Sequence, residues 1–232
     1  MSVVRISYYS DILCVWAYIG QRRLEQLVAD FGEAISIETR FCSVFPDARA
    51  KIAAAWKDRG GDRGFNENMH KLARRFPHIE MHPDIWLEVK PRSSASPHLF
   101  VKAVELVERD ELGDERMRLP YLERRGTRAA WALRRGFFAE NRDVATWAVQ
   151  CEIAEELGID RARLETHVHS GEALAALSAD YDDGQKQGIT GSPTFVMNDG
   201  RQRLFGNVGY RLLEANVQEL LNDPSPNAAS WC

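Results

Sequence analysis

Hydrophobic and polar positions follow two different periods along the N-terminal part of this 232-residue chain. Residues 3–9 form a short run of β-branched and aromatic residues, which predicts a strand. From Val15 to Phe31 the apolar residues recur at helical spacing, and Gly32 is placed to end that helix. Residues 34–41 alternate again, which predicts a second strand. The order strand, helix, strand predicts a parallel pair joined by a right-handed crossover.

The middle of the chain has helical periodicity only. Ser96 and Pro97 resemble the N-cap and first residue of a helix, and Gly158 is placed as a helix stop. We expect an all-helical layer with shorter helices after Asp160. The four longer helices are predicted over residues 62–76, 96–109, 125–141 and 144–157.

The C-terminal part returns to strands. Residues 194–197 and 203–205 predict two short strands, and Asn198-Asp199-Gly200 between them predicts a hairpin turn. Residues 210–221 then predict an amphipathic helix. The two ends of the chain are therefore expected to share one sheet. The predicted parts are an α/β domain of residues 1–45 and 186–223, an inserted helical domain of residues 46–185, and a flexible tail of residues 224–232.

The charge pattern excludes some partners. The 30 Lys and Arg residues are interspersed with 34 Asp and Glu residues, and the formal net charge is -4. This distribution offers no basic surface for nucleic acid or anionic lipid. The chain also has no export signal pattern and no apolar run of about 20 residues. We therefore expect a cytoplasmic protein that binds neither nucleic acid nor a membrane.

The cysteines do not form a metal motif or a disulfide framework, because they lie far apart at Cys14, Cys42, Cys151 and Cys232. Cys42, at a strand end, and Cys151, on the periodic face of a helix, are interpreted as packing residues. We also expect no metal site at the two histidines of the HVH segment, because a two-residue spacing does not bring side chains to one face of a helix.

Cys14 has a different setting, since it lies where the first strand ends and the first helix begins. There its sulfur would face unpaired backbone N–H groups and the positive end of the helix dipole. Such cysteines can have a pKa lowered from about 8.5 to roughly 3.5–7.5, which makes them nucleophilic at neutral pH. The alternative is a small side chain that fills the strand–helix junction. Asp11 is expected to cap the turn, and its charge would act to raise the pKa of the thiol.

Three segments resemble a known family. YYSDILCVWAYIG (residues 8–20) resembles the pattern of DsbA and FrnE-type proteins, in which an aromatic strand leads to CPWC and then YIG. GITGSPTFV (188–196) resembles the family loop that carries a cis proline, and residues 133–160 are similar to the family's inserted segment. Kappa-class glutathione transferases and 2-hydroxychromene-2-carboxylate isomerases share this architecture. The resemblance implies an α/β, thioredoxin-like fold with a large all-helical insertion.

The resemblance also implies site residues. Cys14 matches the nucleophilic cysteine, Pro193 the cis proline, and Ser192 the residue whose backbone pairs with a bound peptide or glutathione, while Trp16 is expected at the rim. One departure matters: CPWC is CVWA here, so Ala17 replaces the resolving cysteine. A dithiol oxidant stores its oxidising equivalent as an internal disulfide, which Cys14 cannot form with Ala17. Release of a mixed disulfide would need an external thiol such as glutathione.

A second route of release would use another cysteine of the chain, such as Cys232 in the tail. Kappa-class transferases instead use the group at this position to hold the glutathione sulfur as a thiolate. In that family a Gly-Ser-Asp turn binds the γ-glutamyl end, and the matching Gly206-Asn207-Val208 lacks the carboxylate. An acid of the segment 180–183 could substitute for it, or that segment could be a solvated acidic surface turn.

These observations favour a glutathione-dependent thiol-disulfide oxidoreductase or transferase that uses Cys14, with the insertion covering an apolar co-substrate pocket. The expected glutathione-binding residues are Trp16, Ser192, Pro193, Asn207 and Val208, and the partners are a small thiol and an electrophile or protein disulfide. The resemblance also implies a homodimer. A glutathione-dependent isomerase of the 2-hydroxychromene-2-carboxylate type and a redox-inactive peptide-binding module are the alternatives.

Overall fold

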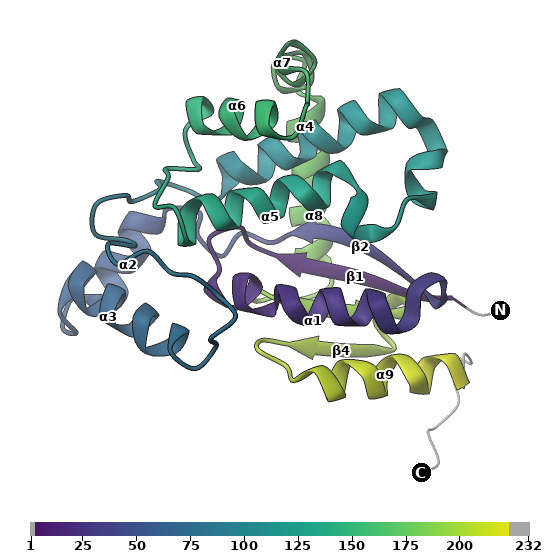
Figure 1. Ribbon diagram of the computed structural model, residues 1–232, viewed down its shortest axis with the longest axis horizontal. Coiled ribbons are helices and arrows are strands. Elements are labelled where there is room, and N and C mark those ends of the chain that lie inside the picture. Colours follow the sequence, from purple (N-terminus) through teal and green to yellow (C-terminus); the bar gives the residue numbers. More distant parts are fainter. Residues whose placement is uncertain (1–2, 223–232) are drawn as a thin grey trace.

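The computed structural model describes residues 3–222 and is organised around one mixed four-stranded sheet (Figure 1). The strand order is β2-β1-β3-β4. β1 and β2 are parallel, as predicted, and β3 runs antiparallel to both β1 and β4. The two ends of the chain therefore share one sheet. The strands are β1 (Val4–Ser10), β2 (Ile35–Phe41), β3 (Thr194–Met197) and β4 (Gln202–Phe205). The tail predicted over residues 224–232 lies outside the described residues.

Helices cover both faces of the sheet. α1 (Val15–Phe31) and α9 (Tyr210–Asn222) lie on one face (Figure 1), where side chains of β1 and β3 pack against Leu24 and Leu213. α8 (Glu172–Lys186) packs against the other face, where Gly184 lies beside the ring of Tyr9. Because successive side chains of a strand point to opposite faces, this cover buries the consecutive residues Tyr8, Tyr9 and Ser10 at the end of β1.

The insertion forms the helical layer that the sequence predicts. α4 and α5 pack against each other and share the largest apolar cluster with the start of α1. α2 and α3 lie apart from the other helices, beside the end of the sheet at which α1 begins (Figure 1). The remaining elements are α2 (Ala48–Trp56), α3 (Gly61–Ala73), α4 (Ala95–Leu112), α5 (Arg125–Phe138), α6 (Trp147–Glu156) and α7 (Arg161–His169).

The helices differ from the prediction in four places. α6 begins at Trp147 rather than at residue 144, because Thr146 is extended and is its N-cap residue. α8, with 15 residues, is not one of the shorter helices expected after Asp160. α2 was not predicted, because it is short and buries only Ala48 and Ile52; Asp47 caps it by accepting from the amide of Ala50. α4 begins at Ala95, with Ser94 as its N-cap residue. Ser96 cannot serve as the cap, because it lies inside the first turn and its hydroxyl donates to the Ala145 carbonyl at 2.8 Å.

Turns and helix ends otherwise follow the sequence signals. The β3–β4 hairpin turns through Asn198 and Asp199, which have φ values of 44° and 57°, and such left-handed conformations are tolerated by these residue types. Gly32 ends α1 with a φ of 47°. Over residues 3–222, no helix has both the length and the apolar character needed to cross a membrane.

Candidate active site

Cys14 and the loop before β3 lie side by side although they are far apart in the sequence. Cys14 is the N-cap residue of α1, and its amide donates to the Asp11 carbonyl at 3.2 Å. β3 pairs with β1, and this places the Ser192-Pro193 bond, which is cis, opposite the cysteine. The Cys14 thiol donates to the Ser192 carbonyl at 3.2 Å. The structure thus brings together the three residues on which the family resemblance rests.

The thiol of Cys14 is buried, with 6% of the residue exposed. Burial raises its pKa above the ordinary value, and the negative charge of Asp11 acts in the same direction. The side-chain hydroxyl of Ser192 and the nearby amides of Trp16 and Ala17 favour the thiolate but do not outweigh burial. The predicted lowering of the Cys14 pKa is therefore wrong for this structure. The cysteine is a protonated hydrogen-bond donor.

Asp11 connects four segments around the cysteine and is itself fully buried. Its amide donates to the hydroxyl of Ser192 at 2.9 Å. Its carboxylate accepts from Leu13 N at 2.8 Å, Val44 N at 2.9 Å, Phe45 N at 3.2 Å and Ser94 Oγ at 2.6 Å. Burial raises the pKa of Asp11, while these hydrogen bonds lower it. Asp11 is thus more than the predicted cap, because it fixes the cysteine turn against the cis-proline loop.

His98 lies beneath the same turn in a neutral state. Its ring stacks on Phe41 with centroids 4.3 Å apart, and burial lowers its pKa well below the ordinary value. Nε2 accepts from the amide of Ile12 at 3.1 Å, so the proton lies on Nδ1, which donates to the hydroxyl of Tyr181 at 2.9 Å. The 3.9 Å approach of Nε2 to Asp11 is therefore not an ion pair.

The rim of the site is formed by aromatic and polar side chains. Trp16 is partly buried, and its ring meets that of Phe76 edge-on, with centroids 6.2 Å apart. The guanidinium carbon of Arg23 lies 5.9 Å from the centroid of the same Phe76 ring. Arg23 also donates to Asn207 Oδ1 at 2.6 Å. The residue before Asn207, Gly206, donates its amide to the Pro193 carbonyl at 2.8 Å. Phe76 and Arg23 thus connect Trp16 to the turn that carries Asn207.

The expected substitutes for the missing carboxylate are engaged elsewhere. Val208 packs its side chain against the core cluster of α1 and α9. Asp180 is buried, and its carboxylate lies 2.7 Å from the ammonium of Lys102. Asp183 accepts from the hydroxyl of Tyr9. Asp182 is exposed. All three acids belong to α8, so the segment is not a surface turn, and Asp180 and Asp183 are already engaged by Lys102 and Tyr9.

The other cysteines have different surroundings. Cys42 is buried, as predicted; its thiol lies 3.7 Å from the Gly191 carbonyl, and burial raises its pKa. Cys151 is only partly buried, so it is not a core residue. Cys232, the other candidate for releasing a mixed disulfide, lies outside the described residues. Within residues 3–222, no group of three or more His, Cys, Asp or Glu side chains could hold a metal ion.

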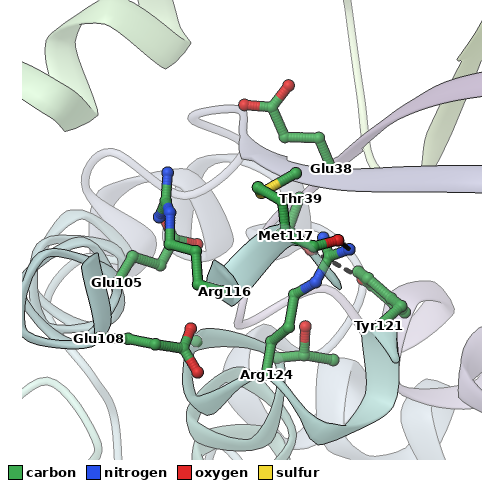
Figure 2. Close-up of a pocket in the computed structure, with 10 residues that line it drawn as sticks. Glu38, Thr39, Glu105, Glu108, Arg116, Met117, Tyr121 and Arg124 are labelled. Carbon is green, nitrogen blue, oxygen red and sulfur yellow. Dashed lines mark hydrogen bonds between the residues drawn. The ribbon is translucent and has the colours of Figure 1, made fainter. Parts of the chain in front are cut away.

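A small polar cavity of about 70 Å³ lies away from the cysteine, between β2, α4 and the start of α5 (Figure 2). Its charged groups serve the fold: Glu108 accepts from the amide of Arg125 at 2.8 Å, and Arg124 donates to the carbonyls of Ile37 and Met117. An apolar cavity of about 540 Å³ lies further along β2, lined by its first residues and by the segment 117–121. Neither matches the co-substrate pocket that was expected beside Cys14.

The comparisons with known proteins agree with this geometry. A model of the DsbA-like thioredoxin domain matches residues 5–218. The chain belongs to the DsbA-like thioredoxin family. The thioredoxin-like fold with a helical insertion, expected from the resemblance, is thereby confirmed. Among the curated proteins, no match is found.

Several solved structures share the fold. A probable DsbA oxidoreductase from Streptomyces coelicolor has a TM-score of 0.70 at 18% identity, covering 98% of this chain and 94% of that one. The cytosolic disulfide reductase DsbM from Pseudomonas aeruginosa has a TM-score of 0.60 at 19% identity, covering 92% and 98%. A 2-hydroxychromene-2-carboxylate isomerase has a TM-score of 0.62 at 16% identity, covering 97% and 100%. At these identities the likeness concerns the fold.

Sequence reasoning missed part of the site. The role of His98 had no signal, because a lone histidine inside a helical pattern is indistinguishable from a core residue. Arg23 and Phe76 were missed because Phe76 lies in an irregular segment after α3, far along the chain from α1. For Asp11 the sequence did contain a signal, because its position three residues before Cys14 indicated a residue that contacts the cysteine turn.

Proposed function

We propose that this protein is a glutathione-dependent thiol-disulfide oxidoreductase that uses Cys14 as its single nucleophile. The observation that carries the proposal is the position of the Cys14 thiol at the start of α1, 3.2 Å from the carbonyl that precedes the cis Pro193. Ala17 occupies the place of a second cysteine and is fully buried. The DsbM fold neighbour has also been solved with GSH, which supports glutathione as the external thiol.

The chemistry runs in two exchange steps. Cys14 loses its proton to water, and its thiolate attacks the glutathionyl sulfur of a mixed disulfide, RSSG. The Cys14–SG bond forms, the RS–SG bond breaks, and RS⁻ leaves and takes up a proton. A glutathione thiolate then attacks the same glutathionyl sulfur, which returns the Cys14 thiolate and releases GSSG. The net reaction is RSSG + GSH → RSH + GSSG, so one glutathione is consumed and the other half of GSSG comes from the substrate.

The site has features that suit the thiolate once it forms. The α1 N-terminus presents its amides and positive dipole end to the sulfur. Burial favours the protonated resting thiol, so the exchange requires the proton to leave before the sulfur attacks. The negative charge then passes from Cys14 to the leaving sulfur within each exchange step.

The protonated state of Cys14 favours a second candidate, a glutathione transferase. A buried thiol that donates a hydrogen bond, as Cys14 does to the Ser192 carbonyl, could donate instead to a glutathione thiolate and hold it for attack on an electrophile. In that reaction the glutathione sulfur forms the new bond, and Cys14 undergoes no covalent change. The 2-hydroxychromene-2-carboxylate isomerase alternative would use the same arrangement, in which the Cys14 thiol donates to a bound glutathione thiolate.

Turnover assays with two substrates distinguish these functions. One substrate is a glutathionylated peptide with reduced glutathione, and the other is 1-chloro-2,4-dinitrobenzene with reduced glutathione. The oxidoreductase proposal predicts peptide deglutathionylation that is lost in Cys14→Ser and retained in the control Cys151→Ser. Conjugation that persists in Cys14→Ser, without deglutathionylation by the wild type, would support the transferase. Peptide binding without either activity would overturn both and leave the binding module.

A further inference from the structure

Arg23 is a partly buried cation that no carboxylate neutralises within residues 3–222. Burial lowers the pKa of its guanidinium, and the opposing influence comes from Tyr8 rather than from an acid. Its hydrogen bond to Asn207 Oδ1 occupies one of its five N–H donors. A partly desolvated guanidinium with free donors is an attractive partner for an anion.

Arg23 also belongs to the rim of the Cys14 site. Trp16 and Arg23 are seven residues apart on α1, which places them on the same face of the helix about two turns apart. Phe76 touches both, through its edge-on contact with Trp16 and its position beneath the guanidinium. Asn207 closes the other side, because its turn is bonded to the Pro193 carbonyl. These contacts form a continuous border from the cysteine to the guanidinium and back to the cis proline.

The spacing fits a short peptide. Arg23 follows Cys14 by nine residues, or about 13 Å along the helix axis. Helical side chains lean toward the N-terminus of the helix, which brings the guanidinium nearer to the sulfur. An extended tripeptide spans about 10 Å. A terminal carboxylate of a small thiol peptide can extend up to about 10 Å from its sulfur, so such a peptide bound with its sulfur at Cys14 would direct that carboxylate toward Arg23.

We propose that Arg23, oriented by Asn207 and the ring of Phe76, selects thiols and mixed disulfides that carry a carboxylate about one tripeptide length from the sulfur. This inference rests on the proposed function and specifies the substrate class of the same site. The turn beside Arg23 carries the uncharged residues Asn207 and Val208, so the charge offered near this turn is the positive charge of Arg23. Recognition would depend on a substrate carboxylate rather than on its ammonium group.

The test measures the rate at which a Cys14 mixed disulfide forms with symmetrical disulfides of defined charge. The probes are glutathione disulfide, its glycyl ethyl ester, the disulfide of γ-glutamylcysteine, and uncharged 2-hydroxyethyl disulfide. Arg23→Gln is compared with Arg22→Gln, which removes an exposed arginine from the neighbouring position of the same helix. Arg23→Lys keeps the charge but not the fork of donors.

We expect Arg23→Gln to lower the apparent second-order rate for glutathione disulfide about tenfold, as the loss of a charge-assisted hydrogen bond predicts. Arg22→Gln and the 2-hydroxyethyl disulfide rates should stay unchanged, and Arg23→Lys should recover part of the loss. The response of the two modified probes identifies the carboxylate. If Arg23 contacts the glycyl carboxylate, the ethyl ester becomes insensitive to Arg23→Gln; if it contacts the γ-glutamyl carboxylate, both the ethyl ester and γ-glutamylcysteine disulfide remain sensitive.

Equal loss with all four probes would overturn the inference, since it would show a general effect on the fold. Equal rates for Arg23→Gln and the wild type with glutathione disulfide would also overturn it. These results leave the proposed function intact, because the wild type still forms the adduct. If the wild type forms no adduct with any probe, the proposed function itself fails.

Discussion

Replacing Asp11 by Asn should lower the stability of the fold and also lower the pKa of Cys14. The Asp11 carboxylate accepts four hydrogen bonds, whereas an amide offers one accepting oxygen and one donating nitrogen. If the side-chain oxygen in Asp11→Asn accepts from the amides of Val44 and Phe45, its NH2 group faces the Leu13 amide. Two hydrogen-bond donors then point at each other, and one is left without an acceptor. One buried donor without a partner costs about 1–3 kcal/mol. Removal of the charge relieves part of this cost, because burial disfavours the carboxylate.

The pKa of Cys14 should fall, since the Asp11 charge contributes to raising it. Urea denaturation measures the stability, and the pH dependence of iodoacetamide alkylation, followed by peptide mass, measures the thiol. Ser94→Ala is the matched control, because it removes one hydrogen bond to Asp11 and leaves the charge in place. That control should lose stability without a lower thiol pKa. An unchanged Cys14 pKa in Asp11→Asn would refute the electrostatic reasoning.

Two further predictions concern buried groups. Lys102→Met leaves the Asp180 carboxylate buried without its ammonium partner and should destabilise the protein by about 3 kcal/mol in urea denaturation, whereas Arg109→Met, in an exposed pair, should cost less than about 1 kcal/mol. A near-zero effect of Lys102→Met would contradict the assignment of a buried ion pair. Burial raises the pKa of both Cys14 and Cys42 above that of a thiol in the unfolded chain. The free energy of unfolding is therefore unaffected by the ionisation of these thiols below the ordinary thiol pKa, and it falls as the pH rises above that value, because the unfolded chain releases their protons first. Cys42→Ala should therefore reduce the fall in the urea midpoint between pH 8 and pH 10, and an unchanged fall would count against this linkage.

The fold could be predicted in large part because its pattern is local. The two periods before residue 42, the turn at Asn198 and the amphipathic α9 each arise from neighbouring residues. The cis state of the Ser192-Pro193 bond was predicted from the resemblance, since no local pattern distinguishes it from a trans bond. Helix α2 was missed because its nine residues bury too few apolar side chains to show a period.

The site could be predicted less completely, because its properties depend on tertiary contacts. The sequence shows that Cys14 begins a helix, and this alone predicts a lowered pKa. It does not show that the cis-proline loop covers the thiol or that Asp11 is buried beside it, and these features raise the pKa instead. The contact of Arg23 with Asn207 joins residues 184 positions apart, so no spacing in the sequence could indicate it.

The central claim is that Cys14 acts alone as the nucleophile that exchanges with glutathione. Intact mass spectrometry after incubation with glutathione disulfide tests it most directly, using the wild type, Cys14→Ser and Cys151→Ser. The account predicts one glutathione adduct that maps to Cys14, is absent in Cys14→Ser, persists in Cys151→Ser and is removed by reduced glutathione. An unmodified Cys14, or an adduct that remains in Cys14→Ser, would contradict it.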